Sequence, residues 1–216
     1  MARTRVKICG ITRPEDARQA AQQGADALGL VFYAASKRAV SPSQAAVIQS
    51  VTPVFVSLVG LFVNPDKNDV RAALKHVHLD CLQFHGDEDA VFCESFGVPY
   101  MKAVRVRPGS DGLIIDPLLE AAAHPNARAI LLDAFDAQQP GGTGKQFDWS
   151  VARRCVEQST MPVVLAGGLN AGNAAQAITE VQPWALDLSS GVESEPGLKD
   201  PQKMQAFFNE VNRVRI

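Results

Sequence analysis

The sequence carries a thiol and a carboxylate at the ends of two short apolar segments. Cys9 follows the alternating apolar residues Val6 and Ile8, and Asp133 ends the apolar run 129–132. A thiolate is a usable base and a protonated carboxyl group is a usable acid. A carboxylate that ends an apolar strand loses hydration unless it gains a partner, which favours a functional role for Asp133. For Cys9 the residues alone leave a second interpretation open, a small buried apolar side chain.

Small residues follow two later apolar segments. They are Gly167 and Gly168 after segment 162–166, and Ser189, Ser190 and Gly191 after segment 185–188. Small residues let backbone amides approach an anion, and the loops after the last two strands of a barrel often bind phosphate. One glycine pair could simply make a tight turn. Because the feature recurs, we predict a phosphate site.

Segment 141–145, Gly-Gly-Thr-Gly-Lys, resembles part of a nucleotide-binding P-loop. The complete motif requires a glycine five residues before the last glycine and a serine or threonine after the lysine. Gln139 and Gln146 stand at those positions, so the motif fails. We interpret the segment as a loop that covers a phosphorylated ligand, with Gly142 and Gly144 as candidate phosphate-binding residues. A merely solvated loop is the alternative.

Three further polar residues lie at or near predicted strand ends. Arg38 follows Lys37 and, on charge alone, fits one half of a solvated ion pair. His85 follows segment 79–84 and could cap the next helix. Asp187 lies inside segment 185–188, where it either faces the site or pairs with a neighbour. These alternatives stay open at this point.

Eight apolar segments, each followed by a segment with helical features, would position these residues. The predicted strands are 6–9, 27–32, 54–63, 79–84, 100–104, 129–132, 162–166 and 185–188, and the better-defined helices are 13–23, 118–123, 149–157, 173–181 and 201–214. Thr12 with Glu15, and Ser41 with Gln44, have the spacing of capping boxes. The repeated unit predicts an α/β protein with one (β/α)8 barrel over residues 1–216. An open doubly wound sheet is disfavoured because no glycine fingerprint follows the first strand.

Composition narrows the classes of partner. The chain has 216 residues, of which 46% are apolar, and a net charge of -2. We therefore expect no binding to nucleic acid or to membranes, and a cytoplasmic protein. The four cysteines are widely spaced and include no C-x-x-C pair, so we expect no metal site.

An ordered set of segments resembles phosphoribosylanthranilate isomerase over almost the whole chain. The segments are 7–12, 24–33, 36–42, 60–64, 82–86, 132–134, 141–149, 166–170 and 187–193. The resemblance implies the barrel fold and an Amadori rearrangement of a phosphorylated sugar without metal or cofactor. It implies Asp133 as general acid and Cys9 as general base. It further implies that Arg38 holds the anthranilate carboxylate and that His85 and Asp187 line the aromatic end. We expect a monomer or a homodimer.

Two other kinds of function compete with this interpretation. Another phosphate-binding barrel enzyme, such as an indole-glycerol-phosphate synthase, would need a lysine acid at a strand end, for which Lys102 is available. A pentose-phosphate epimerase would need paired aspartates or metal-binding histidines, which the strand ends lack. The second kind is a phosphate-ligand binding protein without catalysis, and the presence of both Cys9 and Asp133 argues against it.

Overall fold

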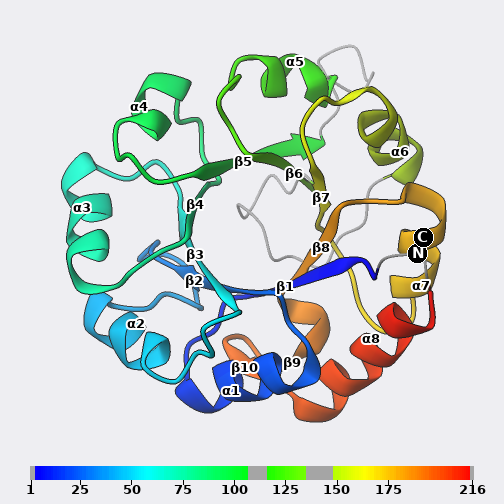
Figure 1. The fold of residues 1–216 in the computed structure, drawn as a ribbon, viewed down its shortest axis with the longest axis horizontal. Coiled ribbons are helices and arrows are strands. Elements are labelled where there is room, and N and C mark those ends of the chain that lie inside the picture. Colours follow the sequence, from blue (N-terminus) through cyan, green and yellow to red (C-terminus); the bar gives the residue numbers. More distant parts are fainter. Residues whose placement is uncertain (1–2, 107–115, 135–147, 215–216) are drawn as a thin grey trace.

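Eight parallel strands close into a barrel, and helices surround it (Figure 1). The computed structural model describes residues 3–106, 116–134 and 148–214. The strands neighbour one another in chain order, and β1 closes the barrel by pairing with β8. Their bounds are β1 Arg5–Cys9, β2 Ala27–Val31, β3 Ser57–Phe62, β4 Cys81–Phe84, β5 Tyr100–Val106, β6 Ala129–Ala134, β7 Val163–Leu165 and β8 Ala185–Leu188. The predicted (β/α)8 barrel is confirmed.

Helices follow the strands and form the outer layer (Figure 1). Their bounds are α1 Pro14–Gln23, α2 Pro42–Gln49, α3 Lys67–His76, α4 Ala90–Glu94, α5 Pro117–Ala122, α6 Trp149–Gln158, α7 Ala174–Val181 and α8 Pro201–Arg213. None of the helices that the structure describes has the length and apolar character needed to cross a membrane.

The two predicted capping boxes have different outcomes. Ser41 caps α2, and its side chain accepts a hydrogen bond from the amide of Gln44, as expected. The prediction for Thr12 is wrong, because Arg13 occupies the cap position of α1 and makes no side-chain cap. The Thr12 hydroxyl instead donates to the carbonyl of Gly197, at 2.5 Å. A tertiary partner has replaced the local one.

The third strand is shorter than predicted. It begins at Ser57, because residues 53–56 form a turn in which the amide of Val56 donates to the carbonyl of Pro53. Val54 and Phe55, which the apolar pattern assigned to the strand, are exposed in this turn. Apolar character alone therefore misplaced the start of β3.

The alternation of side chains along the strands separates two apolar regions. One set of strand side chains packs with the helices in the main core. The other set, which includes Ala103, Leu131 and Val164, forms a cluster that contains no helix residue and fills the barrel interior. Cys9 lies in a third, small cluster with Val31 and Leu61. Side chains two residues apart on a strand share one of these faces, so the register decides which polar groups enter the barrel.

A small two-stranded sheet, which no sequence pattern predicted, lies between β8 and α8. A short 3₁₀ helix, η1 (Ser190–Val192), leads into β9 (Glu193–Glu195), which pairs with β10 (Leu198–Lys199). In Figure 1 this sheet lies beside α1 and α8. It brings two charged residues, Glu193 and Lys199, to the carboxyl ends of β1 and β8.

Packing between strands and helices should carry most of the stability. We expect Leu82→Ala to lower the free energy of unfolding by about 2–5 kcal/mol, because Leu82 is fully buried on the outer face of β4. Leu119→Ala is the matched control, since Leu119 is 72% exposed, and it should cost no more than about 0.5 kcal/mol. Urea unfolding of both variants measures the difference. Equal costs would contradict this account of the core.

Candidate active site

Three of the predicted site residues, Cys9, Asp187 and Asp133, lie on the inner face of the barrel. Cys9 ends β1, and Lys7, two residues earlier, aligns with Asp187 of β8. Asp133 of β6 aligns with Arg105 of β5 and follows the interior residue Leu131 by two positions. Because parallel strands share their direction, the ends of β1 and β6 open on the same side of the barrel. The thiol and the carboxylate therefore face one mouth.

His85 faces Asp133 across this mouth. Its Nε2 atom lies 3.2 Å from Oδ2 of Asp133, and both side chains are buried. On the other side of the ring, the side-chain amide of Gln83 donates to Nδ1 at 3.0 Å. An amide nitrogen can only donate, so in this arrangement Nδ1 is the acceptor. The buried Nε2 atom has no hydrogen-bond partner among the described residues. The suggestion that His85 caps a helix is wrong, because Asp89 caps α4.

Asp133 is held by its own strand as well. Its Oδ1 atom accepts a hydrogen bond from the amide of Ala134 at 2.9 Å, which leaves Oδ2 toward His85. Gly167, after β7, lies against this group: a side-chain Cβ there would stand 3.2 Å from Oδ1 and 3.0 Å from the amide of Ala134. Gly167 also has a positive φ of 87°, which favours glycine.

Asp187 pairs with a neighbour inside the barrel. The Lys7 ammonium donates to Asp187 Oδ1 at 2.8 Å, and both side chains are almost completely buried. Burial opposes the charge on Lys7, but Asp187 and Cys9 outweigh that effect and hold the pKa of Lys7 above its usual value. Burial also raises the pKa of the Cys9 thiol, while Lys7 and Lys199 oppose the rise.

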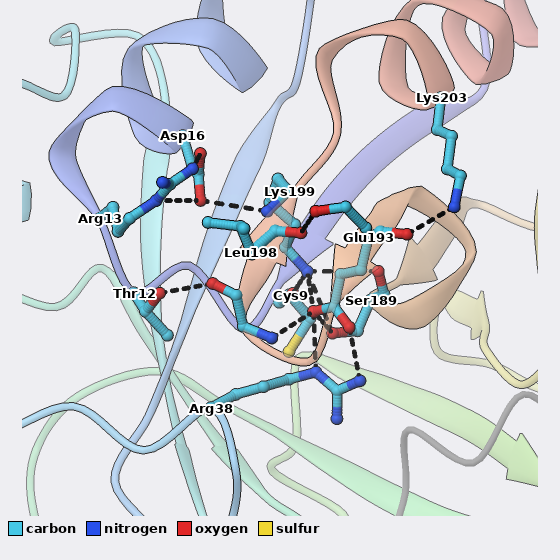
Figure 2. A network of polar contacts seen from close by, with 12 residues as sticks. Cys9, Thr12, Arg13, Asp16, Arg38, Ser189, Glu193, Leu198, Lys199 and Lys203 are labelled. Atoms are coloured by element: carbon cyan, nitrogen blue, oxygen red, sulfur yellow. Dashed lines mark hydrogen bonds and ion pairs between the residues drawn. The ribbon is translucent and has the colours of Figure 1, made fainter.

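Arg38 stands beside Cys9 and is held by Glu193 (Figure 2). Its Nε and Nη2 atoms donate to the two carboxylate oxygens at 2.9 and 2.7 Å. The side chain of Arg38 is 15% exposed, so the solvated ion pair suggested by charge alone is wrong. A guanidinium has five N–H donors. The second edge, formed by Nη1 and Nη2, has no partner among the residues that the structure describes and can still take a planar carboxylate.

Lys199 ties the ends of β1 and β8 together (Figure 2). Its buried ammonium donates to the carbonyl of Cys9 at 2.6 Å, to the hydroxyl of Ser189 at 3.1 Å and to Glu193 Oε1 at 2.8 Å. Burial alone would raise the pKa of Glu193, but hydrogen bonds from Arg38 and the charge of Lys199 lower it to about 2. Glu193 is therefore a carboxylate shared by two cations.

The predicted phosphate-binding turns lie next to each other at the ends of β7 and β8. Gly191 approaches the backbone of Leu169 so closely that a side chain could not be placed there. The turns are partly exposed. Among the described residues, the amides of Gly168 and Ser190 donate to no other group. Partly exposed amides without partners, in two adjacent turns, can bind an anion. Gly142 and Gly144 lie outside the described residues.

The structure separates the two basic residues of the fifth strand. Lys102 points outward, where its ammonium contacts Glu88 at 3.0 Å and the carbonyl of Gly86 at 2.5 Å. It therefore holds the loop after β4 and does not face the barrel mouth, which removes the lysine acid needed by the synthase alternative. Arg105 is the inward residue, and it donates to the carbonyl of His85 at 2.8 Å.

Lys7, Glu193 and Lys199, which support the predicted residues, were not predicted from the sequence. Lys7 had a signal, because it is a charged residue two positions before Cys9 within an apolar strand. Glu193 and Lys199 had none, since a short hairpin after β8 has no periodicity that predicts what it contacts. In residues 3–106, 116–134 and 148–214 no group of three or more histidine, cysteine or acidic side chains is arranged to hold a metal ion.

Comparison with known proteins identifies relatives over the whole barrel. A family model described as N-(5'phosphoribosyl)anthranilate (PRA) isomerase matches residues 6–210. The N-(5'-phosphoribosyl)anthranilate isomerase of Azotobacter vinelandii is 52% identical over 214 residues, which cover 99% of this chain and 100% of the relative.

Solved structures give the same result. The phosphoribosyl anthranilate isomerase of Thermotoga maritima is 38% identical, with a TM-score of 0.86, over 98% of this chain and 100% of that one. A second phosphoribosyl anthranilate isomerase was solved in complex with reduced 1-(o-carboxyphenylamino)-1-deoxyribulose 5-phosphate. It is 36% identical, with a TM-score of 0.83, over 98% of this chain and 100% of that one.

Glu193 should contribute strongly to stability. We expect Glu193→Gln to lower the free energy of unfolding at neutral pH by about 3–5 kcal/mol, because it leaves two cations without their buried partner. The matched control is Glu195→Gln in the same strand, where the residue is exposed, with a change of no more than about 0.5 kcal/mol.

The same pair of proteins has a diagnostic pH dependence. A carboxylate with a lowered pKa stabilises the fold above its unfolded pKa of 4.5, and this stabilisation is lost as the pH falls toward about 2. Unfolding curves of the wild type should therefore lose stability across this range more steeply than those of Glu193→Gln. Parallel losses in the two proteins would contradict the assignment.

Proposed function

The chain belongs to the N-(5'-phosphoribosyl)anthranilate isomerase family, and from this membership we propose how its residues perform the reaction. The enzyme is an isomerase of tryptophan biosynthesis that converts N-(5-phosphoribosyl)anthranilate into 1-(2-carboxyphenylamino)-1-deoxyribulose 5-phosphate. The reaction opens the ribose ring and moves a hydrogen from C2 to C1. It therefore needs an acid for the ring oxygen and a base for C2.

Asp133 is the proposed acid and Cys9 the proposed base. In its protonated form Asp133 gives its proton to the ring oxygen as the bond between C1 and that oxygen breaks, and the anthranilate nitrogen forms a double bond to C1. The resulting iminium acidifies the C2 hydrogen, which the Cys9 thiolate takes. The enolamine that forms then tautomerises to the ketone. One observation carries this proposal: the two groups lie on the inner face of the barrel, at the same mouth, on strands β1 and β6.

The remaining predicted residues can bind the two charged ends of the substrate. We assign the anthranilate carboxylate to the Nη1–Nη2 edge of Arg38, because Glu193 occupies the other edge and fixes the guanidinium plane. His85 and Asp187 line the inner wall near the aromatic ring, each held by a partner, Gln83 and Lys7 respectively. The turns with Gly168 and Ser190 take the phosphate through their amides.

Removal of either proposed catalytic group should nearly abolish turnover. We expect Cys9→Ala and Asp133→Asn each to lower kcat by about 10²–10⁴-fold, because each removes one proton-transfer group. Fluorescence-monitored conversion of phosphoribosylanthranilate measures the effect. Cys155→Ala and Asp69→Asn are the matched controls, since Cys155 is buried in α6 and Asp69 is exposed on α3. Turnover near the wild-type rate in either test variant would refute the assignment of that residue.

The phosphate position can be tested without turnover. A crystal structure with reduced 1-(o-carboxyphenylamino)-1-deoxyribulose 5-phosphate should have its phosphate within hydrogen-bond distance of the amides of Gly168 and Ser190. The reason is that these amides need an acceptor at the carboxyl ends of β7 and β8. A phosphate bound only at Gly144 and Lys145 would instead favour a nucleotide-type loop.

A further inference from the structure

The buried ammonium of Lys7 and the sulfur of Cys9 are neighbours inside the barrel. Both side chains project inward from β1, two residues apart. Cys9 aligns with Gly29 of β2, and the end of the Lys7 side chain reaches the same glycine. A Cβ placed on Gly29 would stand 2.8 Å from the sulfur and 3.0 Å from Lys7 Nζ. Glycine at this position therefore leaves the space that the two groups share.

Lys7 is fixed in this place by Asp187. The ion pair of 2.8 Å joins adjacent strands, and the side chains are 5% and 8% exposed. A buried lysine held by a carboxylate keeps its charge and cannot swing into solvent. The ammonium is thus a permanent cation beside a buried thiol.

The other cations around Cys9 are bound to other groups. Lys199 is directed to the carbonyl of Cys9 and to Glu193, and Arg38 is bound to the same glutamate. The segment Ala27–Val31 of β2 contains no titratable side chain. Three other titratable residues stand near this wall: Tyr33 packs against the small cluster around Cys9, the Cys81 thiol is half-buried in β4, and Asp187 is the partner of Lys7. Lys7 is the cation whose charged atom shares the space of the sulfur.

We propose that Lys7 is a positioning residue that stabilises the thiolate of Cys9, with Asp187 as the anchor that keeps the ammonium beside the sulfur. The proposal rests on the role of Cys9 as the base and adds the group that makes a buried thiol usable in it. A buried thiolate is unfavourable without a nearby positive charge. When the thiolate takes the C2 proton it becomes a thiol, and the positive charge of Lys7 stays where it was.

The two members of the ion pair should act on Cys9 with opposite signs. Lys7→Met removes the cation and leaves the Asp187 anion near the sulfur, so the pH at which Cys9 becomes a thiolate should rise by about 1–3 units. Asp187→Asn removes the anion but leaves an amide oxygen that can still accept the hydrogen bond from Lys7, so the cation stays in place and the same midpoint should fall. A purely structural ion pair would make the two variants behave alike.

The measurement is the pH dependence of alkylation of Cys9 by iodoacetamide in the ligand-free enzyme. Mass spectrometry of the peptide that contains Cys9 separates it from the other three cysteines. The matched control is Lys102→Met, which breaks another buried lysine–carboxylate pair on the outer face of the barrel, with Nζ 3.0 Å from Glu88. It should leave the midpoint unchanged. Lys7→Arg, which keeps a positive charge, should stay closer to the wild type than Lys7→Met.

Opposite shifts in Lys7→Met and Asp187→Asn support the proposal, and shifts of one sign or no shift overturn it. If Lys7→Met does not fold, Asp187→Asn decides: a lower midpoint supports the proposal, and an unchanged or higher one overturns it. The pH profile of kcat in Lys7→Met should move to higher pH with KM little changed.

The outcome can be told apart from a failure of the proposed function. Cys9→Ala with normal turnover would remove Cys9 as the base, whatever the alkylation midpoints are. If Cys9→Ala is inactive but the alkylation midpoint of Cys9 is the same in Lys7→Met as in the wild type, Cys9 remains the base and only the role of Lys7 is refuted.

Discussion

Two buried ion pairs fix the charged groups beside Cys9 in this barrel. Lys7 with Asp187 and Arg38 with Glu193 are bonded at 2.8 and 2.7 Å, and each pair joins segments far apart in the chain. An unpaired charge in such a place would be strongly unfavourable, so each partner fixes the other. The site is therefore rigid where it is charged. The groups that could exchange protons, Cys9 and Asp133, are set into this frame.

The ion pairs also explain how the end of β1 supplies several groups of the site. The end of β1 supplies the thiol through Cys9 Sγ, a backbone carbonyl that holds Lys199, and the cation Lys7. The hairpin of β9 and β10 adds Glu193, which binds the Nε–Nη2 edge of Arg38 and leaves the Nη1–Nη2 edge for another carboxylate. In the proposed reaction, substrate binding at Arg38 and proton transfer at Cys9 therefore rest on the same set of ion pairs.

Much of the architecture was readable from local pattern. Strands buried on both faces appear as apolar runs, and residues such as Ser41 and Pro42 mark where helices start. The capping prediction at Thr12 was wrong because its hydroxyl binds the carbonyl of Gly197 and not the local helix end. The strand prediction at Val54 and Phe55 was wrong because these apolar residues lie exposed in a turn. The hairpin after β8 was missed, because two very short strands have too few residues to show a period.

The sequence by itself determined the fold class and which residues come to the strand ends, because alternation and turn residues act over a few positions. It also predicted Cys9, Asp133 and the small residues after β7 and β8 as candidates. Only the tertiary structure decided the partners: Lys7 for Asp187, Glu193 for Arg38, and the outward direction of Lys102. Those contacts join segments that are distant in sequence, and they depend on barrel closure and strand register, which a one-residue shift would reverse.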